Sequence, residues 1–369
     1  MMNFNKSWVL KYFLIVFSFY CFVIVFNYKI DSMGIFGKSN DLLNAAKDII
    51  NGETIAGLKN YDERLFQELI IANNQKKNNI IVLGSSQSML IRKKHISNKE
   101  QFDFFNHSVS GANLTDFISI IGAYKKNRNY IPANIIISID PWIFSKYGLQ
   151  TNKLSSLNKY YKFMINILNN KRTNLINDDK LGEFRKVFQL VNFDYTMSNI
   201  SHLKKKINNK KNMFYKVNNT SIDDMIKEED GSIHYPHKIR YVDPIIVKRK
   251  TKVFKIGSLE RITSDDNLYN VVLFEKFINY LLINNTNITI VLPPIHPNIY
   301  KIVTKELNYN ILDNVTQYIY NFSRSNGINV IGSYDPSLYG FKNADFFDGM
   351  HGHENVMKKI TNEYKNNGE

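Results

Sequence analysis

A serine in a tight turn is the first residue of this chain whose type and position suggest chemistry. Ser86 lies in the stretch GSSQS at 84–88, directly after the apolar run IIVL at 80–83. An apolar run that ends at glycine and small hydroxyl residues predicts a buried strand that opens into a tight turn. In open α/β sheets, ligands and reacting groups gather at that end of a strand. Ser86 is therefore a candidate nucleophile.

A carboxylate and a histidine near the C-terminus are the groups that a serine nucleophile needs. Asp348 stands three residues before His351, within FFDGMHGH at 346–353. On a loop that enters the last helix, this spacing sets both groups on one side of the turn. Asp348 would then orient the imidazole, and His351 would take the proton of the serine. His353 is an alternative base, and a cap of the following helix is the alternative role for Asp348.

Five apolar stretches predict the strands that position these residues. They lie at 80–83, 102–106, 135–139, 288–292 and 328–331. Helical spacing predicts helices over 87–94, from 114 to 121, and near 265–283 and 303–324. Strands that alternate with helices predict an α/β domain whose parallel sheet is covered on both faces. The alternation stops at about 147–255, which we expect to form a partly helical insertion or cap over the active edge of the sheet.

In order and spacing, these blocks resemble the SGNH (GDSL-like) hydrolase superfamily. Gly84 to Ser86 matches its first block, Asn106 to Gly111 its second, and Asp348 to His351 its last. The match covers about 76–146 and 265–369, and it is similar to the extracytoplasmic, membrane-anchored branch typified by DltD, AlgJ and AlgX. The resemblance implies a flavodoxin-like three-layer sandwich (the SGNH hydrolase fold) over 76–369. It also implies a catalytic triad of Ser86, Asp348 and His351, and an oxyanion hole that includes the amides of Ser86 and Gly111.

The third block departs from the family pattern. The family usually supplies an asparagine to the oxyanion hole there, whereas this strand ends in IDPW at 139–142. A carboxylate stabilises an oxyanion only when it is protonated, so we expect another donor, for which Asn113 is a candidate. Asp140 and Trp142 are candidate substrate-binding residues, as is His296 in the loop after the fourth strand. The alternative for Trp142 is a packed aromatic.

The N-terminal segment has the composition of a membrane-spanning helix. No charged residue occurs from Tyr12 to Tyr28, and the run is dense in Phe, Leu, Ile and Val. Its length is near the lower limit for a span. No small-residue cleavage pattern follows it, which favours an uncleaved anchor over a secretory signal peptide. We expect a cytoplasmic start and anchor over 1–30, stalk or linker helices over 31–75, and a catalytic domain on the extracytoplasmic side of a bacterial cytoplasmic membrane.

Composition limits the cofactors and partners to be expected. The single cysteine, Cys21, allows no intrachain disulfide and no thiolate metal cluster. His234 and His237 are separated by a proline and lack carboxylate or cysteine partners, so we expect neither a metal nor another cofactor. The formal net charge of +15 fits a solvated basic surface, or attraction to an anionic membrane face or polymer. No nucleic-acid-binding pattern occurs, so we expect no nucleic acid as a partner.

The resemblance implies an acyltransferase or esterase that acts on a cell-envelope polysaccharide through an acyl-enzyme, with acetyl as the simplest group. A membrane-bound O-acyltransferase would be its partner. A glycan acetyl-esterase is an alternative, because transfer and hydrolysis use the same triad. A non-catalytic glycan-binding or scaffold protein is the alternative from another class, and the missing third-block asparagine favours it. A Rossmann-type nucleotide site at 80–90 would need a Gly-x-Gly-x-x-Gly spacing, which does not occur there.

Overall fold

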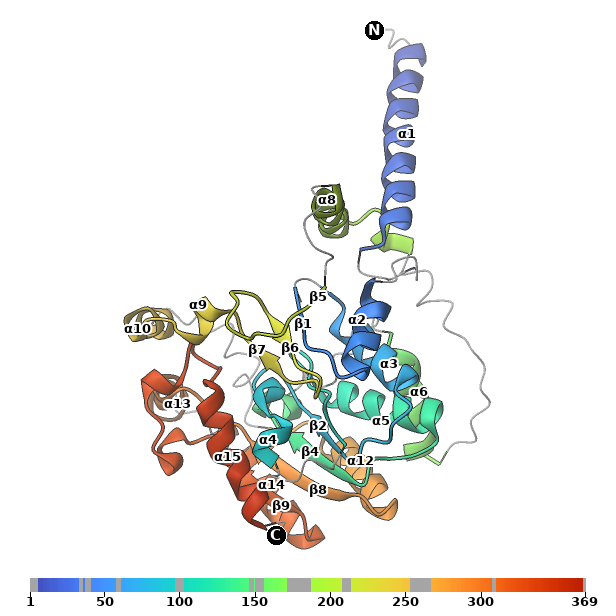
Figure 1. Ribbon diagram of the computed structural model, residues 1–369. Coiled ribbons are helices and arrows are strands. Elements are labelled where there is room, and N and C mark those ends of the chain that lie inside the picture. Colours follow the sequence, from blue (N-terminus) through green and yellow to red (C-terminus); the bar gives the residue numbers. More distant parts are fainter. Residues whose placement is uncertain are drawn as a thin grey trace, which may run out of the picture.

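The central element is a sheet of five parallel strands in the order β3-β2-β4-β8-β9 (Figure 1). The strands are β2 (Ile80–Leu83), β3 (Phe104–Asn106), β4 (Asn134–Ser138), β8 (Asn287–Leu292) and β9 (Asn329–Gly332). This computed structural model describes residues 6–32, 36, 41–57, 61–96, 103–145, 149, 156–170, 187–207, 214–252, 267–306 and 310–367. The predicted α/β class and the five-stranded parallel sheet are confirmed.

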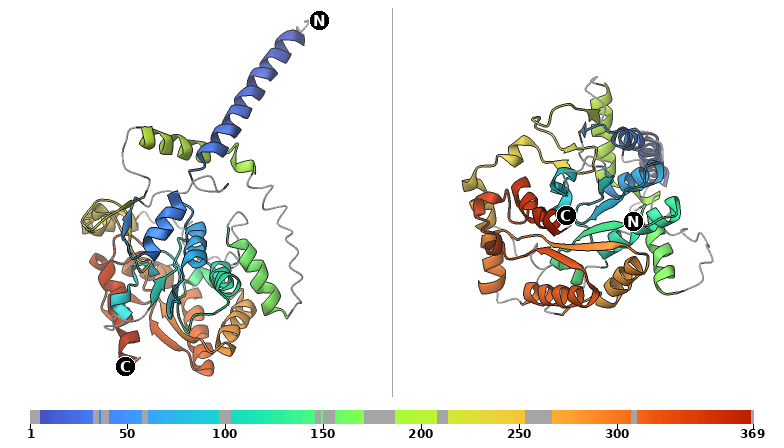
Figure 2. Two further views of the ribbon diagram at one scale, coloured as in Figure 1. Left: turned by 45° about the vertical axis from the view of Figure 1, so that its right-hand side comes forward. Right: turned by 60° about the horizontal axis from the view of Figure 1, so that its bottom comes forward.

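Helices cover both faces of this sheet, because successive residues of a strand point to opposite sides. Ile81 and Leu83 of β2 face one core, which they share with α5 (Leu114–Arg128), α6 (Asn158–Leu168), α12 (Val271–Ile283) and α14 (Ile311–Asn326). Ile80 and Val82 face the other core, with α4 (Lys93–Ile96) and α15 (Glu354–Asn367). The right-hand view of Figure 2 shows α15 on one side of the strands and α12 and α14 on the other. Because the strands are parallel, the carboxyl ends of all five lie at the same end of the sheet, between the two helical layers.

The helices differ from their predicted bounds in three places. The helix expected over 87–94 is replaced by the 3-10 turn η1 (Ser88–Leu90) and α4. The helix expected near 265–283 is α12, and residues 265 and 266 lie outside the described part of the chain. In place of one helix near 303–324 stand α13 (Pro297–Lys301), a π-helical turn η3 (Ile302–Glu306) and α14.

The segment after the N-terminal helix is built into the folded body. α2 (Asp41–Ile50) buries Leu42, Ala45, Ala46 and Ile49, and it packs against α3 (Glu63–Asn73). Together with Phe105 of β3 and with Phe214, these helices form a third apolar core at the edge of the sheet. The expectation of a stalk over 31–75 is corrected accordingly, because a stalk would leave these apolar side chains in water.

The segment expected as an insertion at about 147–255 contributes helices and a second sheet. α6 packs on α5, and α8 (Phe193–Ile207), α9 (His237–Arg240) and α10 (Pro244–Lys252) follow along the chain. The second sheet is antiparallel and has the order β5-β1-β6-β7, made of β5 (Tyr215–Lys216), β1 (Ile55–Ala56), β6 (Ile226–Lys227) and β7 (Ile233–His234). The tip of the β6–β7 hairpin lies against the edge strand β3, where the Asp230 carbonyl accepts a hydrogen bond from the Asn106 N–H (2.8 Å).

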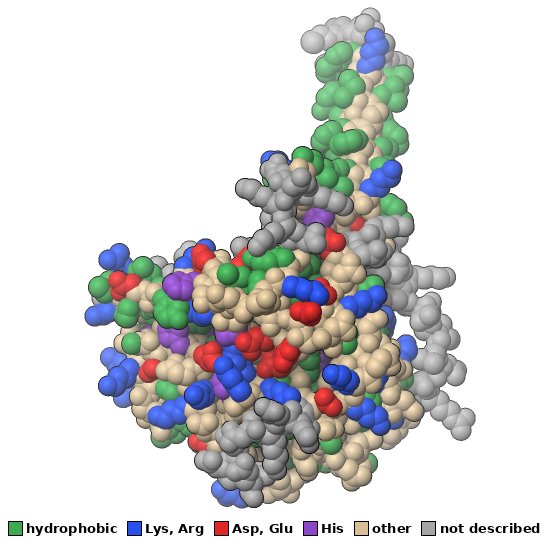
Figure 3. Space-filling view, viewed as in Figure 1, with side chains coloured by type: hydrophobic (Ala, Val, Ile, Leu, Met, Phe, Trp, Pro, Cys, Tyr) green, Lys and Arg blue, Asp and Glu red, His purple; other side chains and the backbone are tan. Residues whose placement is uncertain are grey.

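The N-terminal helix α1 (Lys6–Ile30) projects from the body as a single rod (Figure 1), and hydrophobic side chains cover its shaft (Figure 3). The 23 residues from Trp8 to Ile30 are long and apolar enough to cross a membrane. In the most apolar 18-residue window of this helix, no residue is buried by the rest of the chain. Cys21 is exposed on this helix. Among the described residues, α1 is the one helix with these properties.

Candidate active site

The turn that carries Ser86 begins at Gly84, where neighbouring side chains leave no room for a Cβ atom. β2 ends at Leu83, and a Cβ on Gly84 would collide with Ser88 Oγ and stand 2.8 Å from the Ser138 Cβ of β4. Ser88 Oγ in turn donates to the Ser85 carbonyl (2.9 Å). Ser85 and Ser88 are buried by these contacts, whereas Ser86 at the outer point of the turn is partly exposed.

Asn106, at the end of β3, holds this turn in place. Its Nδ2 donates to the carbonyls of Ser88 (2.8 Å) and Ile91 (2.9 Å), and its Oδ1 accepts from the Ser108 N–H (2.9 Å). A continuous helix over 87–94 would use those two carbonyls for its own hydrogen bonds, which explains why short turns stand there instead. Asn106, where the expected second block begins, therefore positions the turn of the first block, Gly84 to Ser86.

The loop that carries the histidine is held by backbone contacts. Phe346 and Gly352 form an antiparallel bridge, and the Phe347 N–H donates to the His351 carbonyl (3.1 Å). Inside this loop, Asp348 Oδ1 accepts the N–H groups of Met350 and His351, each at 2.7 Å. The carboxylate is thereby fixed on the same side of the turn as the imidazole, as the Asp-x-x-His spacing predicts.

The two loops bring Ser86, His351 and Asp348 into one hydrogen-bonded row. Ser86 Oγ lies 2.7 Å from His351 Nε2, and His351 Nδ1 lies 2.9 Å from Asp348 Oδ2. Burial alone would raise the pKa of Asp348, but the hydrogen bonds from His351 and from the two backbone N–H groups lower it below its ordinary 3.8. His353 packs its ring against Phe347 and takes no part in this row. The arrangement has the geometry of a nucleophile, a base and an orienting carboxylate.

Asp140 lies beneath the nucleophile turn, at the end of β4. Its side chain is completely buried, and its Oδ1 accepts a hydrogen bond from Gln87 Nε2 (3.1 Å). Its Oδ2 is buried without a hydrogen-bond partner among the described residues. Burial raises the pKa of Asp140 from 3.8 to about 7, although the Ser85 hydroxyl and the nearby His351 act to lower it. Because it has no exposed surface, Asp140 supports the turn and does not reach a substrate that lies outside it.

Tyr235, from the segment after β7, covers the nucleophile from the other side. Its hydroxyl donates to the Ser86 carbonyl (3.2 Å). Its ring lies 4.8 Å from that of Phe347 and 6.2 Å from that of His351, measured between centroids. Nothing in the sequence distinguishes it from the other tyrosines of a chain that has 22. This contact brings the segment after β7 to the turn that carries Ser86.

Of the residues expected at an oxyanion hole, Asn113 caps a helix, whereas the amides of Ser86 and Gly111 have no acceptor within the described protein. Gly111 is exposed and has a φ of +58°, in the left-handed region that favours glycine. Among the described residues, the amide N–H groups of Ser86 and Gly111 donate to no protein acceptor. Asn113 is the N-cap of α5, and its Oδ1 accepts from the N–H of Thr115 (3.0 Å) and of Asp116 (3.3 Å). The structure thus uses the acceptor oxygen of Asn113 to begin a helix.

The two aromatic candidates for substrate binding are engaged in packing. Trp142 is half-buried, and its Nε1 donates to the Ala112 carbonyl (2.9 Å), which joins the loops after β4 and β3. His296 is completely buried, and its Nδ1 accepts from the Asn298 N–H (3.2 Å). Burial lowers the pKa of His296 to about 4, against the opposite effect of Asp348. His296 is therefore neutral at pH 7 and packs against Phe346 beneath the histidine loop.

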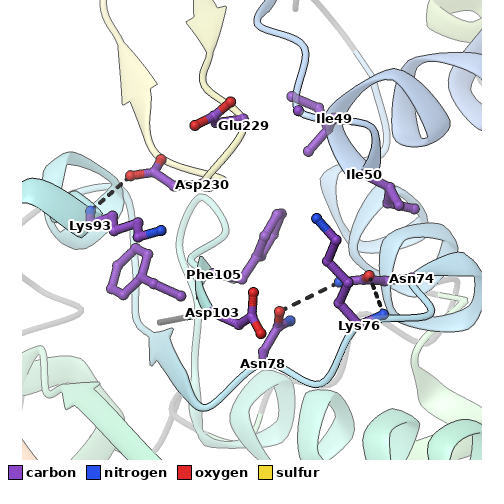
Figure 4. A pocket seen from close by; sticks show the side chains of 12 residues that line it. Ile49, Ile50, Asn74, Lys76, Asn78, Lys93, Asp103, Phe105, Glu229 and Asp230 are labelled. Atoms are coloured by element: carbon purple, nitrogen blue, oxygen red, sulfur yellow. Dashed lines mark hydrogen bonds between the residues drawn. The ribbon is translucent and has the colours of Figure 1, made fainter. Parts of the chain in front are cut away.

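A pocket of about 180 Å³ lies apart from this row, beside the edge strand β3 (Figure 4). Residues of α2, of the chain before β2, and of the β6–β7 tip line it, and none of the triad residues does. Its charged residues have both signs: Lys76, Lys93, Asp103, Glu229 and Asp230. Asp230 accepts a hydrogen bond from the backbone N–H of Lys93 (2.8 Å), so this carboxylate already has a hydrogen-bond partner within the protein.

No group of three or more His, Cys, Asp or Glu side chains that could hold a metal ion occurs in the described parts of the chain. His234, which the sequence places near His237, lies 2.5 Å from Glu228 Oε1 and 3.0 Å from the buried Arg92 guanidinium.

No protein-family model and no curated protein sequence matches the chain.

Proposed function

We propose that this protein is a membrane-anchored serine acyltransferase or esterase of the SGNH type, which transfers an acyl group, most simply acetyl, through Ser86. The observation that carries the proposal is the row in which Ser86 Oγ lies 2.7 Å from His351 Nε2 while His351 Nδ1 lies 2.9 Å from Asp348. Three residues of these types in hydrogen-bond contact have the arrangement of a Ser-His-Asp relay. A strand order of 2-1-3-4-5 along the chain, as in flavodoxin-like sheets, further supports this type of fold.

In the proposed reaction, Ser86 Oγ attacks the carbonyl carbon of an acyl ester while His351 Nε2 takes the hydroxyl proton. The bond from that carbon to the leaving alkoxide then breaks, and His351 returns the proton to the alkoxide. In the second half, His351 deprotonates an acceptor hydroxyl, whose oxygen attacks the acyl carbon. The bond from that carbon to Ser86 Oγ then breaks, and His351 returns the proton to Ser86 Oγ. Asp348 holds the imidazole in the tautomer that this sequence requires and stabilises its charged form. Each bond that forms is matched by one that breaks, and no cofactor takes part.

The negative oxygen of each tetrahedral intermediate needs hydrogen-bond donors. The amides of Ser86 and Gly111 are suited to this role, because neither donates elsewhere among the described residues. The positive φ of Gly111 leaves its side of the loop open, and no atom lies within 4 Å of where a Cβ would stand. The buried Asp140, which occupies the position of the family's third-block asparagine, acts through Gln87 on the turn and not on the oxyanion.

The acceptor is a hydroxyl of a cell-envelope polysaccharide, and the donor side is a membrane-bound O-acyltransferase. Support for this part comes from α1, which is long and apolar enough to anchor the domain at a membrane, on its extracytoplasmic side in this proposal. A glycan acetyl-esterase uses the same row of residues with water as the acceptor. Incubating the full-length protein with an acetyl donor and a polysaccharide separates the two, since transfer produces acetylated glycan and hydrolysis produces free acetate.

A serine-reactive phosphonate tests the catalytic part of the proposal. The full-length protein should be labelled at Ser86, and Ser86→Ala should not be labelled at all. His351→Gln should slow labelling at least a hundredfold, because the serine loses its base. His353→Gln is the matched control, two residues away in the same loop, and should label at the rate of the unaltered protein. Equal labelling of the two histidine variants would refute the relay and favour a non-catalytic scaffold.

A further inference from the structure

The segment 187–207 carries large apolar side chains that the described chain leaves 42–75% exposed. Phe193, at the start of α8, is 75% exposed, and Met197 one turn later is 47% exposed. The stretch just before α8 adds three more apolar side chains, and Ile207 ends the helix; the exposed set is Val187, Phe188, Val191, Phe193, Met197 and Ile207. Within α8, residues 193, 197, 200, 204 and 207 recur on one face of the helix. This face is apolar except for Lys204.

The opposite face of α8 is bound to the end of α1 by buried polar groups. Asn27 Nδ2 donates to Thr196 Oγ1 (2.7 Å), and Asn199 Nδ2 donates to Asn27 Oδ1 (2.9 Å). Tyr195 Oη donates to Asp31 Oδ1 (2.7 Å). Asn27, Asp31 and Asn199 have no exposed surface. These contacts fix α8 at the level of the last turn of α1.

That level is the boundary between the apolar span and water. The apolar segment of α1 ends at Ile30, and the polar residues that bind α8 lie at its last turn and just beyond. The left-hand view of Figure 2 shows α8 running across the foot of α1, with the folded body on the side away from the rod. A helix at this depth that crosses the direction of the span lies along the membrane surface.

We propose that α8 and the stretch 187–192 before it form an amphipathic membrane-interface segment, which inserts its apolar side chains between the lipid headgroups beside α1. The inference rests on the part of the proposed function that makes α1 a membrane span. Phe188, Phe193 and Met197 are of the types that such helices bury at the boundary of headgroups and acyl chains. Lys204 places positive charge on this helix, and the chain as a whole has a formal net charge of +15, which suits anionic lipid headgroups. The occupant of the apolar face is therefore a lipid surface that contains anionic lipids.

The proposal predicts the depth of single side chains in a bilayer. Cys21→Ser removes the only cysteine of the chain, and Phe193→Cys in that background takes an environment-sensitive fluorescent label. In liposomes of phosphatidylglycerol and phosphatidylcholine, we expect this label to shift to shorter wavelength. Nitroxide groups near the headgroups of these lipids should quench the fluorescence of this label. The quenching in liposomes should be severalfold stronger than that of the same labelled protein in detergent with the same nitroxide lipid.

Two controls make the outcomes distinct. Ile283→Cys, made in the same Cys21→Ser background, replaces a side chain on α12 that is 81% exposed and lies on the folded body. Its label should show neither the shift nor the quenching. The native Cys21, labelled in the unaltered chain, should be quenched by nitroxides on the acyl chains. Quenching at Cys21 but not at position 193 would overturn the interface helix while leaving the anchor intact. Absence of quenching at both would overturn the anchor and the inference with it, although phosphonate labelling of Ser86 would still stand. A shift at position 193 without lipid quenching would assign the face to a second copy of the chain and would also overturn the proposal.

Discussion

His351 contacts both other members of the triad, one through each ring nitrogen. In the proposed relay, Ser86 is the nucleophile, His351 moves its proton, and Asp348 sets which ring nitrogen carries the hydrogen. Residue types, their spacing and the resemblance of their blocks to a known family predicted all three positions. Ser86 follows an apolar strand, and Asp348 and His351 lie in the loop before the last helix. Tyr235 could not be predicted, since it belongs to a segment without periodic pattern and reaches Ser86 only through the packing of the second sheet.

Asp348→Asn should slow phosphonate labelling of Ser86 by about a thousandfold or more. An amide in this place favours the wrong imidazole tautomer, and carboxylate removal in a triad costs about 10⁴-fold in the well-studied serine protease case. The measurement is the second-order rate constant for labelling, with circular dichroism to check the fold. Asp345→Asn, three residues earlier, is the control and should change the rate by less than about tenfold. Comparable slowing in both variants would mean that the loop, and not the relay, sets the rate.

Asp140→Asn should remove a pH dependence of folding stability. The folded-state pKa of about 7 lies above the ordinary 3.8, so the folded state binds this proton more tightly than the unfolded state does. The contribution of neutral Asp140 is therefore complete below about pH 4 and is lost as the pH rises to about 7. At 1.36 kcal/mol per pKa unit, the loss is about 4 kcal/mol.

Denaturation of both forms between pH 4 and pH 8 measures the effect of Asp140. We expect the difference in unfolding free energy to move in favour of the asparagine variant as the pH increases. Two curves that run parallel over this range would contradict a buried, largely neutral carboxyl. The asparagine keeps the size of the side chain and an oxygen for Gln87, so the fold should survive the change.

At the scale of elements, the apolar runs predicted the five strands because buried parallel strands need continuous apolar sequence. The prediction of a helix over 87–94 was wrong, and its cause is a residue outside the local sequence. Asn106, distant in the sequence, takes the carbonyls of Ser88 and Ile91. The prediction of a stalk over 31–75 was wrong although the sequence held a contrary sign. An apolar helix face, which packs against other parts of a fold, is indicated by the helical spacing of Leu42, Ala45, Ala46 and Ile49.

Gly84→Ala should disturb the nucleophile turn more than an alanine at an open glycine does. The added Cβ collides with Ser88 Oγ and meets the Ser138 Cβ at 2.8 Å, and overpacking of this kind costs about 1–3 kcal/mol. Both the unfolding free energy and the rate of phosphonate labelling should fall. Gly327→Ala, where no atom lies within 4 Å, should lower stability alone. Adding Ser88→Ala to Gly84→Ala removes the nearest atom and should restore part of the labelling.

At the scale of the whole molecule, one buried arginine joins three separate parts of the chain. Arg92 Nη1 lies 2.7 Å from Glu228 after β6, and its Nε lies 3.0 Å from Glu354 at the start of α15. Its Nη2 donates to the Ile233 carbonyl of β7 (2.7 Å). The segment with Tyr235 and the C-terminal helix, whose preceding loop carries His351, are thus held to the turn after β2.

Arg92→Leu should lower the unfolding free energy by about 3–5 kcal/mol, because it leaves Glu228 and Glu354 partly buried without their shared cation. Chemical denaturation measures this change. Arg128→Leu is the control, since that guanidinium makes exposed contacts with Gln75, and it should cost about 1 kcal/mol or less. If Arg92→Leu were as mild as the control, the three parts would have to be joined mainly by apolar packing.

The separation of 265 positions between Ser86 and His351 has a consequence for the newly made chain. A ribosome adds about 5–20 residues per second, so the nucleophile precedes its base by on the order of 10–50 s. Throughout that interval the N-terminal helix and the serine turn exist without the imidazole that would activate the hydroxyl. Under the proposed function, the nascent protein reaches its membrane in an inert form, and acyl chemistry begins only when the loop with His351 folds back onto the turn with Ser86.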